Sequence, residues 1–86
     1  MRVRIPTPLR SYTAGDANVT AQGATVAEVL ADLDRRFPGI RFRVVDEQDR
    51  LREHMTVWLD GECCRDLTAP VEHLDELVLM QALSGG

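Results

Sequence analysis

The sequence predicts an α+β fold in which one main helix packs on one face of a mixed sheet of four to five strands. Two observations predict it: residues 25–37 have clear helical periodicity, and several short stretches alternate between apolar and polar residues. The chain has 86 residues, of which 44% are hydrophobic and 28% charged, so we expect one globular domain.

The first predicted element is a half-buried strand. In "RVRI" (residues 2–5), Val3 and Ile5 lie on one side and two arginines on the other. Two prolines end this strand, and a turn-rich segment follows. Residues 18–21, "NVTA", can return as a second strand, so we expect a hairpin with a long loop.

The main helix is predicted over residues 25–37. Thr25 at the N-cap and Glu28 three residues later form a capping box. Two arginines fall in the last turn, where cations favour the helix dipole, and a Pro-Gly pair ends the helix. Apolar residues at helical spacing predict one buried face, made of Val26, Val29, Leu30, Leu33 and Phe37.

Three further strands are predicted in the second half of the chain. Residues 40–54 are polar with scattered apolar positions, and within them we expect "DEQDR" (residues 46–50) to form a loop or a solvated short helix. "MTVWL" (residues 55–59) alternates, and Asp60–Gly61 predicts a hairpin turn before a return strand that begins with "ECC". The last strand, residues 77–83, is apolar on both faces, which favours a central position in the sheet.

A last strand at the centre of the sheet, beside the first strand, is the β-grasp arrangement. Strand alternation then predicts which side chains face the helix: Val3, Ile5, Val57, Leu77 and Leu79. The opposite face is expected to carry a partner-docking patch of Trp58, Val78 and Met80, with Arg2 and Arg4 nearby. The alternative is that the tryptophan only shields the sheet.

Charge and composition narrow the function classes. The net charge is −4 and the ten basic residues, all arginine, are scattered, which argues against nucleic-acid binding. No apolar run approaches the roughly 20 residues that span a bilayer. The N-terminal segment does not resemble a signal peptide, so we expect a cytoplasmic protein.

The residues also give no pattern for catalysis or for metal binding. We find no Gly-rich phosphate loop after a strand and no HExxH motif. Cys63 and Cys64 are adjacent, so they are poorly placed to pair with each other, and two sulfurs are too few for a structural zinc site. We expect them on opposite faces of their strand, one in the core and one at the surface. No catalytic residue, metal or bound cofactor is predicted.

The sequence ends on a Gly-Gly dipeptide. We expect a domain over residues 1–82 and a flexible tail over residues 83–86. Glycine has no Cβ, so Gly85 and Gly86 would fit a tunnel too narrow for other residues. Taken alone, the dipeptide favours a frayed end or a cloning remnant over a functional tail.

Nearly the whole chain resembles the MoaD/ThiS family of small ubiquitin-like sulfur carriers. The resemblance rests on "VRIPTPLRSYTAG", the capped helix, "MTVWLDGE" and the ending "LVLMQALSGG". "IPTPLRSYTAG" is most similar to the branch that serves cysteine or specialised-metabolite biosynthesis. Two departures are "EHLDEL", where relatives commonly read Asp-Gly-Asp, and Gln81, where many have proline.

The resemblance implies a protein co-substrate with no catalytic residues of its own. An ATP-dependent adenylyltransferase of the ubiquitin-activating type would adenylate the Gly86 carboxylate, and a sulfur donor would convert it to a thiocarboxylate. Leu83, Ser84 and Gly85 would thread into the partner's active site, and a biosynthetic enzyme would accept the sulfur. Three alternatives remain open: the small subunit of molybdopterin synthase, a ubiquitin-like protein modifier, and a plain β-grasp binding module.

Overall fold

One mixed sheet forms the centre of the computed structural model, which describes residues 1–82. The strand order is β2-β1-β5-β3-β4; β1 pairs with β5 in parallel, and the other neighbouring strands pair antiparallel. The last strand therefore lies at the centre beside the first, which confirms the β-grasp prediction. The strands are β1 (Arg2–Arg4), β2 (Asn18–Thr20), β3 (Met55–Leu59), β4 (Glu62–Cys64) and β5 (Glu76–Gln81).

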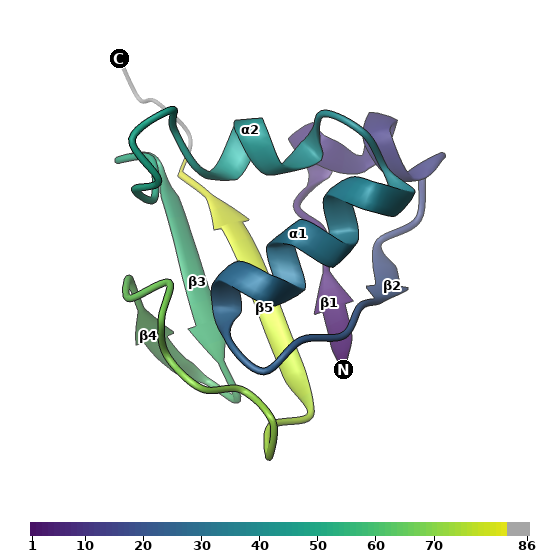
Figure 1. Ribbon diagram of the computed structural model, residues 1–86. Coiled ribbons are helices and arrows are strands. Elements are labelled where there is room, and N and C mark those ends of the chain that lie inside the picture. The colour runs from purple at the N-terminus through teal and green to yellow at the C-terminus, as the bar shows by residue number, and fades with distance from the viewer. Residues whose placement is uncertain (83–86) are drawn as a thin grey trace.

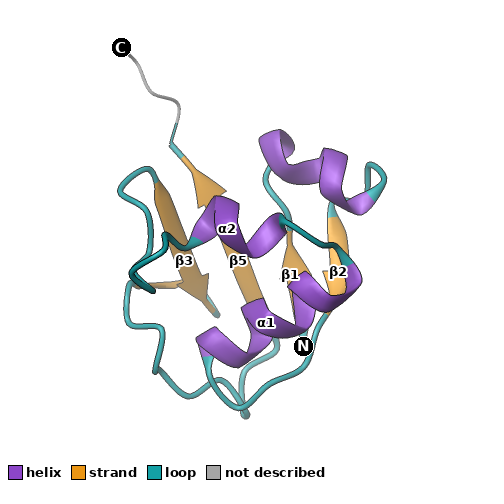
Figure 2. Ribbon diagram, turned by 45° about the horizontal axis from the view of Figure 1, so that its top comes forward, coloured by secondary structure: helices purple, strands orange, loops and turns teal. Residues whose placement is uncertain are grey.

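The helices divide the sheet into a covered face and an open face. Helices α1 (Val26–Arg36) and α2 (Ile40–Val44) lie on the same side of the sheet (Figures 1 and 2). The 3-10 helix η1 (Thr7–Thr13) lies in the connection between β1 and β2. No helix within residues 1–82 covers the opposite face, which we call the open face.

Local capping explains where α1 begins. The Oγ1 atom of Thr25 accepts a hydrogen bond from the backbone N–H of Glu28 at 3.3 Å, as predicted. The Glu28 carboxylate accepts from the N–H of Ala24 at 3.4 Å, one residue earlier than a standard capping box requires. The helix ends before Phe37, which is half-buried against the core.

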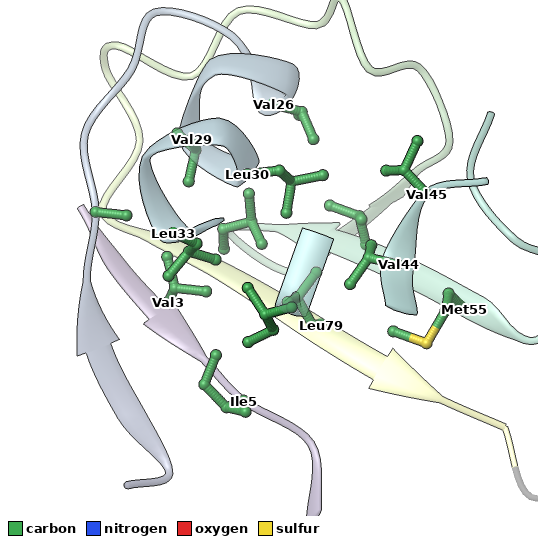
Figure 3. Close-up of a cluster of buried hydrophobic side chains, with 14 of the residues drawn as sticks. Val3, Ile5, Val26, Val29, Leu30, Leu33, Val44, Val45, Met55 and Leu79 are labelled. Carbon is green, nitrogen blue, oxygen red and sulfur yellow. The ribbon is translucent and has the colours of Figure 1, made fainter. Parts of the chain in front are cut away.

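The core fills the space between the covered face and the two α-helices. The five strand residues predicted to face the helix are at most 1% exposed: Val3, Ile5, Val57, Leu77 and Leu79. Figure 3 shows Val3, Ile5 and Leu79 in one cluster of buried side chains with Val29 and Leu33 of α1. Strand alternation therefore predicts this face correctly.

Two segments differ from the sequence-based expectation. Residues 7–13 form η1 rather than an open turn, and Leu9 from this helix is buried. The sequence also predicted no helix over residues 40–44, which form α2 with Ile40 and Val44 at most 1% exposed, whereas "DEQDR" (residues 46–50) is a largely exposed turn, as expected. Each of these helices is short, so sequence periodicity gives little signal; burial against the core decides their conformation.

The β3–β4 hairpin has the predicted turn. Asp60 and Gly61 have φ angles of 45° and 90°, as a two-residue type I′ turn requires. The pairing that follows places Leu59 opposite Glu62 and Trp58 opposite Cys63. The turn thus places Cys63 on the same face of the sheet as Trp58, and Cys64 on the same face as Val57.

Candidate partner interface and tail root

The open face carries all five residues that the sequence predicts for partner docking. Arg2 and Arg4 are exposed, Trp58 and Val78 are half-buried, and the Met80 side chain is 50% exposed. Their strand neighbours on the covered face are buried, so the assignment to faces is confirmed. Their role in docking remains a prediction.

Strand register brings four of these residues together. Val78 of β5 lies between Arg4 of β1 and Trp58 of β3. Met80 lies opposite Thr56, whose Oγ1 accepts a hydrogen bond from the Trp58 indole N–H at 3.2 Å. This hydrogen bond orients the indole N–H of Trp58 toward Thr56, which lies beside Met80 of the neighbouring strand.

The fifth predicted residue, Arg2, lies farther along β1, away from the end of β5. Arg2 pairs across the sheet with Glu76, and its Nε donates to the Glu76 carboxylate at 3.0 Å. An exposed ion pair of this kind contributes little to stability. Arg2 is therefore on the open face but separated from the cluster around Trp58.

Cys63 is an open-face residue that the sequence analysis did not assign. It lies opposite Trp58 and is exposed, whereas Cys64 is half-buried against the core. Both thiols are free. A two-residue turn at Asp60–Gly61 pairs Leu59 with Glu62 and therefore Trp58 with Cys63. The position of Cys63 could thus have been predicted from the sequence.

A groove lies beside the open-face cluster, where β5 runs past the segment that follows β1. It is lined by residues that include Arg4, Pro6, Pro8, Val78, Met80 and Gln81. The Nε atom of Arg10 donates to the carbonyl of Ile5 at 3.0 Å and ties η1 to the end of β1. The groove is thus bounded by a strand and by a proline-containing segment of fixed φ.

The last described residues fix the position from which the tail begins. Gln81 pairs with Met55, and the N–H of Ala82 donates to the carbonyl of His54 at 2.8 Å. We call this point the tail root. The four predicted tail residues, Leu83, Ser84, Gly85 and Gly86, lie outside the described residues.

On the other side of the tail root, α2 and η1 contribute residues that the sequence analysis missed. The Nε atom of Arg43 donates to the Tyr12 hydroxyl at 2.7 Å, and Arg52 lies over the Phe42 ring, 4.6 Å from its centroid. His54 lines two recesses there, one with Tyr12 and Arg43 and one with Phe42 and Arg52. No sequence signal pointed to this cluster, because its geometry depends on how α2 packs.

Two carboxylates with lowered pKa values, Asp32 and Asp46, serve local structure. The pKa of Asp32 is lowered, first by a hydrogen bond from the N–H of Gln22 at 2.9 Å and also by Arg35 and Arg36. Backbone hydrogen bonds from Arg50 and Gln48 lower the pKa of Asp46. These carboxylates stabilise a helix and a turn.

Within residues 1–82, no group of three or more His, Cys, Asp or Glu side chains is arranged to hold a metal ion. The same part of the chain contains no helix long and apolar enough to cross a membrane. The chemical features that stand out in the described structure are the open face and the tail root.

Comparison with known proteins decides the family. A model of the ThiS family matches residues 3–86, nearly the whole chain. The chain belongs to the ThiS family. Membership confirms the resemblance to ubiquitin-like sulfur carriers that the sequence motifs indicate.

Individual ThiS-family relatives agree with this assignment. The sulfur carrier protein CysO of Mycobacterium tuberculosis is 30% identical over 89 residues, covering 98% of this chain and 96% of CysO. A chain of the Amycolatopsis orientalis BexX/CysO complex is 39% identical, with a TM-score of 0.91 and coverage of 99% and 98%. Small archaeal modifier protein 1 of H. volcanii is 27% identical, with a TM-score of 0.76 and coverage of 96% and 97%.

Proposed function

We propose that this ThiS-family protein is a sulfur carrier that holds sulfur as a thiocarboxylate on Gly86. The observation that carries the proposal is the family match, which runs to Gly86 and so includes the Gly-Gly dipeptide. The likeness to CysO, which is named a sulfur carrier protein, also spans nearly the full length of both chains.

The proposed chemistry has two steps, both at the Gly86 carboxyl group. A carboxylate oxygen attacks the α-phosphorus of ATP, which forms an acyl-adenylate and releases pyrophosphate. The nucleophilic sulfur of a donor then attacks the carbonyl carbon and expels AMP. With hydrosulfide as the donor, loss of the S–H proton leaves the sulfur on Gly86 as a thiocarboxylate.

The partners would supply the catalytic groups and the ATP site, so this chain would bind no cofactor and act as a co-substrate. An adenylyltransferase of the ubiquitin-activating type would carry out the first step. Trp58, Val78, Met80 and Arg4 would dock on it, because an exposed apolar cluster with a central tryptophan is typical of an interaction surface. Leu83, Ser84 and Gly85 would thread into the active site as predicted.

The sulfur would pass to a biosynthetic enzyme in cysteine or specialised-metabolite formation, in the cytoplasm. The solved complex of CysO with BexX supports a downstream protein partner, because it pairs a similar carrier with a second protein. The segment "IPTPLRSYTAG" also supports this pathway class, because it is most similar to the family branch that serves cysteine or specialised-metabolite biosynthesis.

A second candidate function is covalent modification of other proteins through Gly86. The likeness to small archaeal modifier protein 1, which is named a modifier, favours it. Both functions share the adenylation step and differ in the nucleophile: a sulfur donor in the first and a lysine amine of a target in the second.

Intact mass spectrometry separates these outcomes. The protein is incubated with ATP, a sulfide source and the ubiquitin-activating-type adenylyltransferase encoded in the same genome. We expect the mass to rise by the difference between sulfur and oxygen, with fragmentation placing the change on Gly86. Modification of Cys63 or Cys64 instead would contradict the proposal, and covalent adducts on target lysines would favour the modifier function.

A further inference from the structure

The tail root lies between exposed apolar side chains on both faces of the sheet. Phe42 and Met80 are the large hydrophobic residues that stand out as exposed within residues 1–82, at 56% and 50%. Met80 is on the open face near the end of β5. Phe42 belongs to α2 on the covered side and lines a recess with His54, whose carbonyl binds the last described N–H.

The two recesses on the covered side of the tail root are lined by basic side chains, although the chain as a whole carries a net charge of −4. Arg43 and His54 line both recesses there, and no Asp or Glu lines either one. Arg43 and Arg52 take part in none of the ion pairs found among residues 1–82. We call Phe42, Arg43, Arg52 and His54 the basic ledge.

Aromatic contacts hold the two guanidinium groups of the ledge in place. Arg43 donates to the Tyr12 hydroxyl and lies 5.9 Å from the centroid of the Tyr12 ring. The Nε atom of Arg52 donates to the carbonyl of Phe42 at 2.8 Å. Each guanidinium retains further N–H donors, so a carboxylate can bind without breaking these contacts.

We propose, on the basis of the proposed function, that the adenylylating partner contacts the tail root from both faces of the sheet. Acidic side chains around the entrance of its active site would bind the basic ledge while the open face docks on its main surface. The ledge adjoins the residue from which the tail begins, so a protein that takes up Gly86 must pass close to it. Charge complementarity then favours a partner surface rich in Asp and Glu.

The test compares charge reversal on and off the ledge. Arg43→Glu and Arg50→Glu make the same change of charge on exposed arginines of neighbouring segments, but Arg50 lines neither recess. Activation is followed by ATP–pyrophosphate exchange with the adenylyltransferase encoded in the same genome. KM for the carrier and KM for ATP are measured separately, at low and high salt.

We expect Arg43→Glu to raise KM for the carrier about five- to tenfold at low salt, with the difference shrinking at high salt. Arg50→Glu should stay within about twofold of the unmodified protein. Phe42→Ala should also raise KM for the carrier, without a salt dependence. Arg43→Gln, which removes the charge without reversing it, should give an intermediate KM.

Equal KM values for Arg43→Glu and Arg50→Glu would overturn the proposal. A change confined to KM for ATP would assign the ledge to nucleotide phosphate, and a change in sedimentation would assign it to a second copy of the chain; either result contradicts an acidic partner surface. Melting curves of each variant identify any loss of folding. If the unmodified protein shows no ATP-dependent activation, the proposed function fails, which is a distinct outcome.

Discussion

The two faces of the central strand differ in what their side chains do. In β5, Leu77 and Leu79 point to the helices and are at most 1% exposed, whereas Val78 is half-buried and Met80 is 50% exposed. The same backbone therefore contributes to a sealed core and to an accessible surface. Changes on the covered face should alter stability, and changes on the open face should alter partner binding.

The largest effect is expected on the covered face, for Leu79→Ala. Leu79 is fully buried between the sheet and the helices, so truncation should lower the free energy of unfolding by about 2–5 kcal/mol. Met80→Ala, its neighbour on the other face, is the matched control and should change stability by about 0.5 kcal/mol or less. Denaturant titration measures both, and equal losses would show that the faces are not distinct.

On the open face, Trp58→Ala should weaken binding to the adenylyltransferase by about 2 kcal/mol or more. The reason is its place at the centre of the cluster, between Val78 and Cys63. Calorimetry measures the affinity, and denaturant titration of the free protein measures the stability. A loss of roughly 3–5 kcal/mol in stability with normal affinity would instead assign the tryptophan to the core.

A smaller effect is expected at the hairpin that sets the register of the open face. Gly61 has a φ of 90°, and a Cβ there would meet no atom within 4 Å. Gly61→Ala should therefore cost about 1 kcal/mol, from backbone conformation alone. Thermal melting checks the cost. Gly15→Ala is the control, because its φ is 89° and its surroundings are equally open, so the two variants should lose similar stability.

The smallest effect concerns pH. The folded protein lowers the pKa of Asp32 below its usual 3.8, first through the hydrogen bond from Gln22, so the ionised carboxylate stabilises the fold. This contribution is present above about pH 4 and is lost as the pH falls toward the lowered pKa. Asp32→Asn should thus be less stable at pH 7, with the difference narrowing below pH 4 in acid titrations. A difference that stays constant would contradict this.

Much of the fold could be predicted because its signals are local. The Thr25 cap, the turn at Asp60–Gly61 and strand alternation each depend on a few neighbouring residues. The burial of α2 could not be predicted in this way, because five residues give no usable periodicity and packing of Ile40 and Val44 decides their environment.

The candidate site divides along the same line. Alternation placed Trp58, Val78 and Met80 on one face, since a strand has a period of two. The basic ledge was missed because α2, residue His54 and η1 meet only in the folded chain. Strand alternation thus predicted the residues of the open face, whereas the basic ledge depends on tertiary packing.

Deletion of Gly86 tests most directly whether activation requires this residue while the fold does not. The buried core runs from Val3 to Leu79, so the deletion should leave the denaturation midpoint unchanged. ATP–pyrophosphate exchange with the adenylyltransferase should be abolished, because the carboxyl group would end one residue short of the active site. Normal exchange by the deletion variant, or a large loss of stability, would contradict the assignment of Gly86 as the sulfur-carrying residue.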